Sequence, residues 1–367
     1  MVERWLALPS AARADVLVPP DRRAGAAALR RFANGSSGRV RLRTAVAAAA
    51  LAGGAGPLIR GRIAVAVDPS VTDADLPDLV LTHRLRVELG DERLLVSVRL
   101  GALRPNGKPV AQAMSGDGSA AAFVKIGWND LTRSLVRREA EQLAALWLPA
   151  PPRSFSVPRI LWAGAWAGHE LLAVQPAEGG PAPSQPPLAA TAELAARGGL
   201  TRSALATSTW WQRVRARAGA AASGADTHRL QQAIDAVERR HGEDELVFGT
   251  AHGDWTPWNM AVRDGRLQVW DWERCATGVP VGLDIAHHLL LVALRRRRRP
   301  MPEALAETFE RTPALIGQVG AEAAAGVAVV ELELLEMAVR FAEARAAGVT
   351  VPHDVFLDTL LDLGNAT

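Results

Sequence analysis

Apolar and polar residues alternate with a period of two between residues 81 and 126, a pattern typical of half-buried β-strands. The alternating segments are 81–89, 94–100, 109–114 and 121–126. Turns rich in Gly, Asp, Asn and Pro separate them, and Arg104-Pro105-Asn106-Gly107 is the clearest, because Pro suits its second position and Asn-Gly suits positive φ. The pattern predicts an antiparallel meander of at least three strands.

A helical period replaces this alternation after residue 129. Apolar residues from Leu131 to Leu146 recur every three or four positions, and Asn129 or Asp130 can cap the helix. Two short strands are predicted next, at 160–163 and 169–174, and a Pro- and Gly-rich crossover follows at 175–187. Beyond the crossover, helical patterns cover 188–197, 203–218, 226–241 and a long segment at 321–347.

These elements predict an α+β chain with two lobes. The first lobe, residues 76–175, is built on an antiparallel sheet, and the second, residues 176–367, is mainly helical. Residues 1–75 are an N-terminal extension, to which the sequence assigns no role. We expect short helical pieces there, with one strand at 63–67.

Composition excludes several classes of protein. The formal net charge is only +3, which does not suggest a protein that coats nucleic acid, so no nucleic-acid partner is expected. The single cysteine, Cys275, permits neither an intrachain disulfide nor a cysteine-based zinc site. The apolar run at 45–56 is too short to span a bilayer, and no signal peptide is recognised at the start. We expect a cytoplasmic protein without a membrane span.

Lysine occurs at only two positions, Lys108 and Lys125, whereas the other forty basic side chains are arginine. The ammonium group is a compact point charge that fits among phosphate oxygens, and arginine does not reproduce it. Lys125 lies near the end of the third predicted strand of the meander. The distribution makes Lys125 a candidate phosphate ligand, while Lys108 is either a second one or an exposed hairpin tip.

One segment combines the groups that phosphoryl transfer requires. Residues 252–259 read HGDWTPWN, and a short predicted strand then delivers Asp271 at the start of DWE. Transfer needs a carboxylate that orients the attacking hydroxyl, hard oxygen ligands for Mg²⁺, and positive charge on the phosphates. Asp254 and Asn259 on one loop, with Asp271 brought beside them, can supply the carboxylate and the oxygen ligands.

HGDWTPWN followed by VWDWE resembles the HGDxxPxN…DWE signature of the aminoglycoside phosphotransferase and choline kinase family, which has a protein-kinase-like fold. The resemblance covers roughly residues 94–345. It implies that Asp254 is the catalytic base and that Asn259 and Asp271 are magnesium ligands. It also implies that His252 braces the loop and that Asp284 is structural.

The first lobe shows the same resemblance. Phe123-Val124-Lys125-Ile126 is similar to the family's third strand, which implies that Lys125 binds the α- and β-phosphates. The following helix implies that Glu139, in preference to Glu141, braces that lysine. The segment 171–176 resembles the hinge that binds adenine, which implicates Val174 and Gln175. The segment 100–108 departs from the protein-kinase glycine-rich loop, so a phosphate contact by Lys108 is left open.

The resemblance implies a kinase that uses ATP or GTP with Mg²⁺ and acts on a hydroxyl of a small molecule, such as a sugar, an aminoglycoside or an amino alcohol. The alternative is a catalytically inactive nucleotide-binding or scaffold protein on the same fold. A protein kinase is disfavoured, because Asp284 follows Asp271 too closely for an activation loop. The acceptor, the nucleotide preference and the oligomeric state are not readable.

The resemblance assigns no role to four further features, the last of which lies inside the 252–259 segment. Glu331, Glu333, Glu336 and Glu343 are expected on the wet face of the long helix, although acidic residues in this lobe bind polycationic sugars in aminoglycoside-modifying relatives. The pair His287-His288 is expected to pack in a helix without binding metal. The arginine run 295–299 is expected to be a solvated surface at a helix end. Trp255 and Trp258 either pack or face the acceptor.

Overall fold

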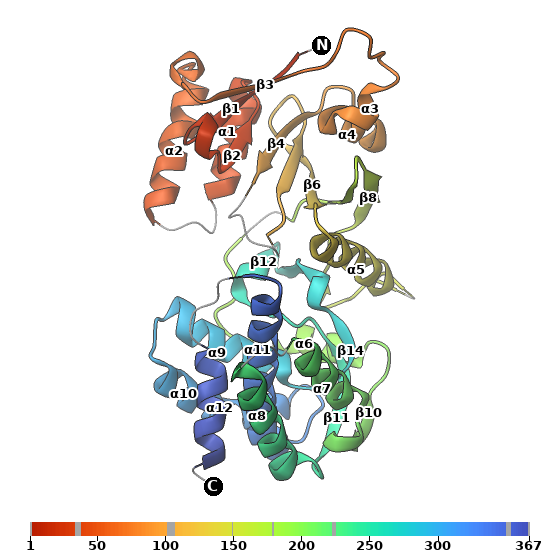
Figure 1. The fold of residues 1–367 in the computed structure, drawn as a ribbon, viewed down its shortest axis with the longest axis vertical. Helices are drawn as coiled ribbons and strands as arrows, with labels where there is room; N and C mark the ends of the chain where they lie inside the picture. The colour runs from red at the N-terminus through yellow and green to blue at the C-terminus, as the bar shows by residue number, and fades with distance from the viewer. Residues whose placement is uncertain are drawn as a thin grey trace. The chain divides into compact units, whose positions relative to one another are not determined.

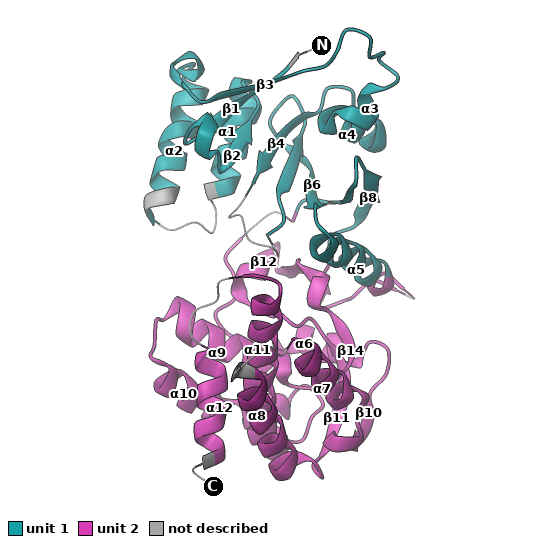
Figure 2. Cartoon of the chain, in the orientation of Figure 1, with its two compact units in different colours: residues 1–144, 158–176 teal, residues 145–157, 177–367 magenta. Residues whose placement is uncertain are grey.

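The structure is a computed structural model that describes residues 2–33, 38–100, 107–148, 150–177, 180–221, 225–349 and 354–365. The chain divides into two compact units (Figure 2). Unit 1 comprises residues 1–144 and 158–176, and unit 2 comprises residues 145–157 and 177–367. Unit 1 holds a large antiparallel sheet, and unit 2 is mostly helical (Figure 1).

The sheet of unit 1 has eight strands in the order β3-β1-β2-β4-β5-β6-β9-β8, and every neighbouring pair is antiparallel. The strands are β1 (Val2–Leu8), β2 (Val16–Val18), β3 (Arg62–Ala66), β4 (Leu95–Arg99), β5 (Val110–Met114), β6 (Ala120–Gly127), β8 (Ile160–Trp166) and β9 (His169–Val174). Strands β4, β5, β6, β8 and β9 match the predicted segments closely. The predicted turn at residues 104–107 lies mostly outside the described residues.

The prediction of a strand at 81–89 is wrong, because this segment is a helix, α4 (Leu81–Leu89). Leu85 is fully buried there, whereas Val87 is exposed, so the alternation does not mark two faces of a strand. Gly90 ends the helix in the left-handed conformation, with φ of 68°. Leu81, Leu85 and Leu89 are spaced by four residues and fit a helix face equally well.

The helix after β6 begins as the sequence predicts. α5 (Asp130–Leu146) is capped by Asn129, whose Oδ1 accepts the Thr132 N–H at 2.8 Å. The Thr132 hydroxyl in turn accepts the Asn129 N–H at 3.0 Å. This reciprocal cap satisfies two backbone donors that a helix start would otherwise leave unpaired.

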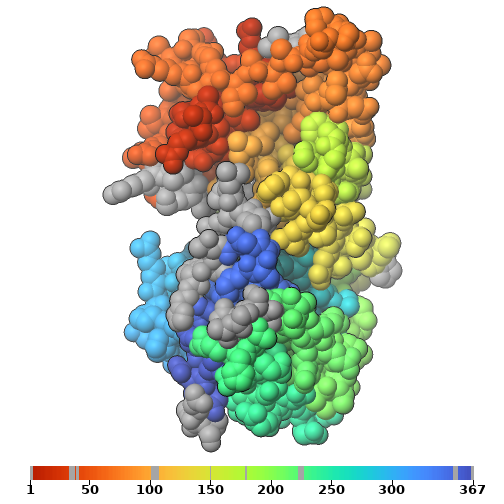
Figure 3. Space-filling model, viewed as in Figure 1, coloured from red at the N-terminus to blue at the C-terminus, as the bar shows by residue number. Residues whose placement is uncertain are grey.

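The N-terminal extension is an integral part of unit 1. Its strands β1, β2 and β3 extend the sheet beyond β4, and helices α1 (Arg22–Ala33) and α2 (Gly38–Ala52) pack on each other. Leu6, Leu29, Leu51 and Met114 share one buried cluster, which joins the extension to β5. In the space-filling view, the red and orange N-terminal segments form a continuous part of the surface of unit 1 (Figure 3). The expected strand at 63–67 is present as β3.

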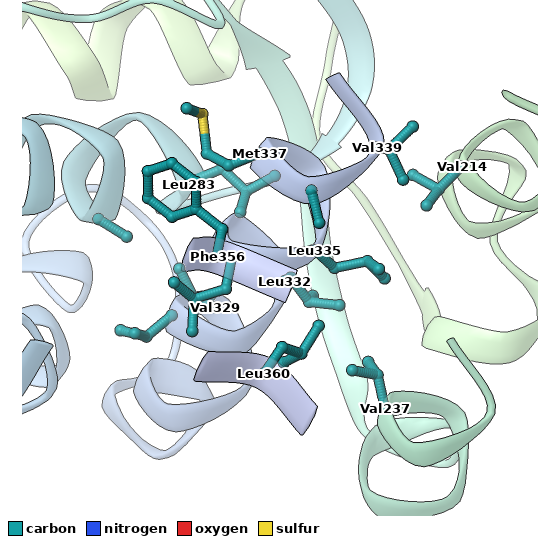
Figure 4. Packing of buried hydrophobic residues seen from close by; sticks show 14 of the residues in the cluster. Val214, Val237, Leu283, Val329, Leu332, Leu335, Met337, Val339, Phe356 and Leu360 are labelled. Atoms are coloured by element: carbon teal, nitrogen blue, oxygen red, sulfur yellow. The ribbon is translucent and has the colours of Figure 1, made fainter. Parts of the chain in front are cut away.

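Most other helices of unit 2 pack around the long helix α11. The helices of this unit are α6 (Leu188–Ala196), α7 (Thr209–Ala221), α8 (Ala225–His241), α9 (Leu283–Leu291), α10 (Met301–Ile316), α11 (Gly326–Ala346) and α12 (Val355–Asn365). Figure 4 shows the apolar packing on α11, where Met337 lies near Leu283 and Phe356, and Val339 lies against Val214 of α7. Among the helices that the structure describes, none has the length and apolar character that a bilayer crossing needs.

Two small sheets complete unit 2. One joins β10 (Thr201–Ala204), β11 (Glu245–Ala251) and β14 (Ala276–Pro280), and the other joins β12 (Met260–Arg263), β13 (Arg266–Val269) and β7 (Phe155–Ser156). The predicted helix at 203–218 therefore begins later than expected, at Thr209. The residues before it pair with β11 or form a short 3₁₀ turn.

Candidate active site

The candidate site is a loop and a hairpin that follow β11. The loop 252–256 leads into a 3₁₀ turn, Pro257–Asn259, and the hairpin β12–β13 then reverses the chain. Its turn is tight, because Asp264 and Gly265 both have positive φ. The N–H of Trp270 donates to the Asn259 carbonyl at 3.0 Å. This closure brings Asp271, twelve residues further along the chain, beside Asn259.

Asp254 and Asn259 contact each other directly. The Asn259 amide nitrogen donates to Asp254 Oδ2 at 2.9 Å and to the Asp254 carbonyl at 3.0 Å. With both donors directed at Asp254, the amide orientation is fixed and its Oδ1 is the atom left to act as an oxygen ligand. Asp271 has φ of 70° and ψ of 59°, the left-handed region that Asn and Asp tolerate better than most residues.

His252 links the two halves of the site, as the resemblance implies. Its Nδ1 accepts the N–H of Asp254 at 3.1 Å, so its proton is on Nε2, which donates to the Trp270 carbonyl at 3.1 Å. Burial lowers the pKa of His252, in accord with a neutral ring. One imidazole therefore holds the backbone at Asp254 and the residue that precedes Asp271.

Buried aromatic side chains pack in and against the loop 252–256. Trp255 and Trp272 are both fully buried, and Phe155 stacks on Trp272 with ring centroids 5.9 Å apart. Trp255 therefore packs. Trp258 is 39% exposed, and the guanidinium of Arg295 lies 5.6 Å from its ring centroid. The loop thus carries one buried and one accessible indole.

Asp284, at the start of α9, anchors the loop from below. Its carboxylate accepts the N–H of His252 at 2.7 Å and the N–H of Gly253 at 2.9 Å. Gly253 has φ of 80°, and a Cβ there would lie 2.7 Å from the Arg274 carbonyl, so only glycine fits. The structural role expected of Asp284 is therefore present in the geometry.

Replacing Asp284 with alanine is expected to lower the free energy of unfolding by about 2–5 kcal/mol, because the buried N–H of His252 and the partly buried N–H of Gly253 lose their acceptor. Asp284→Asn keeps one acceptor oxygen, so its loss should be smaller. Urea unfolding midpoints of both variants test this ranking. Equal stability of wild type and Asp284→Ala would contradict the anchoring role.

The role of His287 was not predicted from the sequence. This buried side chain lies between two carboxylates, with Nε2 3.1 Å from Asp254 Oδ1 and Nδ1 2.7 Å from Glu333 Oε1. Burial alone would lower the pKa of His287, but Glu333 and Asp254 outweigh it and raise the pKa to about 9. The signal was present: His287 follows Asp284 by three residues, so both lie on the helix face that meets the loop.

The pKa of Asp254 moves in the opposite direction. Burial alone would raise it, but the hydrogen bond and charge of His287, together with the hydrogen bond from the Asn259 amide, hold the pKa below its ordinary value. Asp254 is therefore ionised at neutral pH and offers its oxygens only as acceptors.

The expectation of a wet acidic face on α11 is wrong. Glu331, Glu333 and Glu336 are buried, and each is paired with a cation from a neighbouring element. The partners are Arg240 on α8 for Glu331, His287 on α9 for Glu333, Arg217 on α7 and Arg340 for Glu336, and Arg217 for Glu343. These carboxylates are neutralised inside the unit.

Arg340 ties this ion-pair network to the loop. Its Nε donates to Glu336 at 2.7 Å, and its Nη1 donates to the Gly253 carbonyl at 2.7 Å. Gly253 is thus held by Asp284 through its N–H and by Arg340 through its carbonyl.

The arginine run 295–299 is exposed, as expected, and follows α9 through a π-helical turn, Val292–Arg296. Arg297 and Arg299 pair with Glu307 of α10.

In unit 1, Lys125 and Glu139 form the predicted ion pair. The Lys125 Nζ lies 2.5 Å from Glu139 Oε2 and 2.7 Å from Oε1, and Glu139 is buried. The choice of Glu139 over Glu141 is therefore correct for this contact. Lys108 precedes β5, and Val110, two residues later, is the strand partner of Lys125, so both lysines lie at one end of the sheet.

The expected hinge, Val174 and Gln175, lies at the end of β9. Val174 pairs with Phe123 of β6 and with Ile160 of β8. The N–H of Gln175 donates to the Arg159 carbonyl at 2.8 Å. Because this N–H is engaged, an adenine contact at Gln175 would use its carbonyl oxygen.

Comparison with known proteins identifies the fold. No family model matches the sequence, and no curated protein matches it. Among solved structures, an apo thermostable mutant of aminoglycoside phosphotransferase APH(4)-Ia is similar, with a TM-score of 0.50, 14% identity, and coverage of 78% of this chain and 100% of that one. A further variant of that thermostable mutant, in a ternary complex with AMP-PNP and hygromycin B, gives a TM-score of 0.51 at 15% identity, covering 78% and 99%.

The chain thus has the fold of the aminoglycoside phosphotransferases. The predicted α+β class, with an antiparallel sheet in one unit and helices dominating the other, is confirmed. At these identities the likeness establishes the fold, and the activity must be argued from the site.

Proposed function

We propose that this chain is a phosphotransferase that moves the γ-phosphoryl group of ATP or GTP onto a hydroxyl of a small molecule. The observation that carries the proposal is the joining of Asp254, Asn259 and Asp271 by one loop and one hairpin, braced by His252. Such an arrangement places a carboxylate beside hard oxygen ligands, as phosphoryl transfer requires.

The donor set fits a magnesium ion. Asn259 offers an amide oxygen whose orientation is fixed by the hydrogen bonds of its nitrogen. Asp271 offers a carboxylate and directly follows Trp270, whose N–H bonds the Asn259 carbonyl. Both are oxygen ligands of the kind Mg²⁺ prefers. When bound, the ion supplies charge neutralisation and orientation of the phosphates. Asn259 and Asp271 are the residues that would hold it.

Asp254 is proposed to receive the acceptor hydroxyl. Its carboxylate is ionised, so it accepts a hydrogen bond from the hydroxyl and aligns the oxygen for in-line attack. A weak base suits this task, because phosphoryl transfer passes through a loose transition state with little demand for early deprotonation. The proton then has an acceptor in Asp254 as the new ester forms.

Unit 1 is proposed to bind the nucleotide. Lys125, held by Glu139, supplies the positive charge for the α- and β-phosphates, and Val174 with Gln175 supplies the backbone for adenine. Lys108 is a second candidate phosphate contact, because it lies at the same end of the sheet as Lys125.

The acceptor is proposed to be a small hydroxylated molecule. The buried carboxylates of α11 are paired with arginines and His287, so this helix offers little attraction to a polycation. The accessible side chains near the loop include Trp258 and Arg295 instead. A cytoplasmic location belongs to the same proposal, since the one cysteine, Cys275, is buried and no intrachain disulfide is possible, which suits a reducing compartment.

A screen for acceptor-dependent ADP formation tests the proposal. Purified protein with MgATP should form ADP faster in the presence of at least one sugar, amino alcohol or aminoglycoside, and the product should carry the phosphate by mass spectrometry. A thermal-shift titration with MgATP runs in parallel. Nucleotide binding without transfer to any member of a broad panel would favour the inactive scaffold instead.

A further inference from the structure

A buried histidine connects the candidate catalytic aspartate to a second buried carboxylate. His287 on α9 contacts Asp254 at 3.1 Å and Glu333 on α11 at 2.7 Å. His287 and Glu333 are 3% and 2% exposed, so bulk water does not replace these contacts. Three elements distant in sequence therefore meet at one imidazole ring.

The chemistry of the two partners determines the state of the ring. An ionised carboxylate can only accept hydrogen bonds, and both ring nitrogens of His287 face carboxylates. A neutral imidazole would point one lone pair at an oxygen and lose one of the two bonds. The doubly protonated ring makes both, and each is a charge-assisted hydrogen bond.

We propose that His287, braced by Glu333, is a positioning residue that fixes the Asp254 carboxylate for the acceptor hydroxyl. The inference rests on the phosphotransferase function proposed above. His287 touches neither substrate nor nucleotide in this scheme and acts through Asp254.

The geometry shows how the positioning works. His287 holds Oδ1 of Asp254, and Asn259 holds Oδ2, so rotation of the carboxylate about its Cβ–Cγ bond would break a bond on either side. Glu333 fixes the ring plane of His287 through the opposite nitrogen. α9 is itself tied to the loop at Asp284, so the ring and the carboxylate belong to one braced assembly.

The charges also balance. Glu333 offsets the positive charge of His287, so the ring can stay protonated in a buried position without a net charge on the pair. The remaining negative charge is on Asp254, where the acceptor hydroxyl needs a hydrogen-bond acceptor. Without Glu333, Asp254 would be the carboxylate left to stabilise the charged ring.

Two substitutions test the proposal by activity. His287→Gln and Glu333→Gln should each lower kcat by about ten- to a hundredfold, while KM for MgATP stays within about threefold, because nucleotide binding does not use the ring. Glu331→Gln is the matched control. Glu331 is a buried glutamate on the same helix, and its ion-pair partners, Arg240 and His241, both belong to α8.

A merely structural role would lower the unfolding midpoint of Glu331→Gln and Glu333→Gln alike and would leave kcat of both near wild type. Loss of kcat in His287→Gln and Glu333→Gln, but not in Glu331→Gln, supports the proposal. Wild-type kcat in either His287→Gln or Glu333→Gln overturns it. A double mutant adds a second criterion. In an Asp254→Asn background, His287→Gln should cost no further activity, whereas additive losses would contradict action through Asp254.

A spectroscopic measurement separates this inference from the proposed function. In ¹⁵N-labelled wild type at pH 7, the His287 ring should show two protonated nitrogens. Asp254→Asn should shift the Nε2 signal, and Glu333→Gln the Nδ1 signal. A singly protonated His287 ring whose ¹⁵N signals do not change in Asp254→Asn would overturn the inference, even if the enzyme were active. If no acceptor were phosphorylated but these signals appeared, the proposed function would fall while the His287–Asp254 contact stood.

Discussion

Replacing Asp254 with asparagine is expected to lower kcat for phosphoryl transfer by about 10²–10⁴-fold, the range that a positioned proton acceptor contributes. Asparagine has the same shape, but it lacks the charge that aligns the hydroxyl, and its amide hydrogens would face a donor in either orientation, Asn259 or His287. KM for MgATP should change little, because the nucleotide contacts are proposed to lie elsewhere. Steady-state kinetics with a phosphorylated acceptor from the screen measure this.

The matched control is Asp264→Asn. Asp264 is an exposed aspartate in the turn of the β12–β13 hairpin, and asparagine tolerates its positive φ. Its activity should equal that of wild type. If Asp254→Asn kept more than a tenth of the wild-type kcat while remaining folded, Asp254 could not be the residue that receives the acceptor hydroxyl.

The second large effect is expected at Asp271. Asp271→Asn should reduce turnover by about 10³-fold at millimolar Mg²⁺, since a lost charged ligand weakens stabilisation worth several kcal/mol in the transition state. Asparagine is a cleaner replacement than alanine here. The backbone at Asp271 has φ of 70°, where alanine would add about 1–2 kcal/mol of strain and confuse lost activity with lost folding.

A magnesium titration identifies the cause of the loss at Asp271. The concentration of Mg²⁺ that gives half-maximal activity should rise at least tenfold in Asp271→Asn, and higher Mg²⁺ should recover part of the rate. The melting temperature without nucleotide should match wild type. An unchanged magnesium dependence together with full activity would remove Asp271 from the proposed ligand set.

Local patterns predicted the core of the fold well. The five strands from β4 to β9 in unit 1 and helix α5 follow from short-range alternation, a helical period and a cap at Asn129, all of which depend on residues close in sequence. The segment 81–89 was assigned wrongly because positions 85, 87 and 89 fit the period of a strand, while positions 81, 85 and 89 fit that of a helix. Only the burial of Leu85 and the exposure of Val87 distinguish them.

Contacts distant in sequence were not predictable in the same way. The strand β1 pairs with β3, some sixty residues later, and an alanine-rich sequence gives no sign of that pairing. The glutamates of α11 read as a polar face because their partners, such as Arg217 and Arg240, lie on other helices. His287 was visible as a helical histidine, but its place between Asp254 and Glu333 depends on the packing of α9 on α11.

The N-terminal strands change the mechanics of β4. In a sheet that began at β4, its outer row of N–H and C=O groups would be unpaired. Here β2 pairs with β4 through Val16 and Leu17, and the N–H of Leu100 donates to the Asp15 carbonyl at 2.9 Å. A displacement of β4 must therefore break the hydrogen bonds to β2 and β5 or move all eight strands together. The strand that leads toward Lys108 is thus held as an interior strand of the sheet.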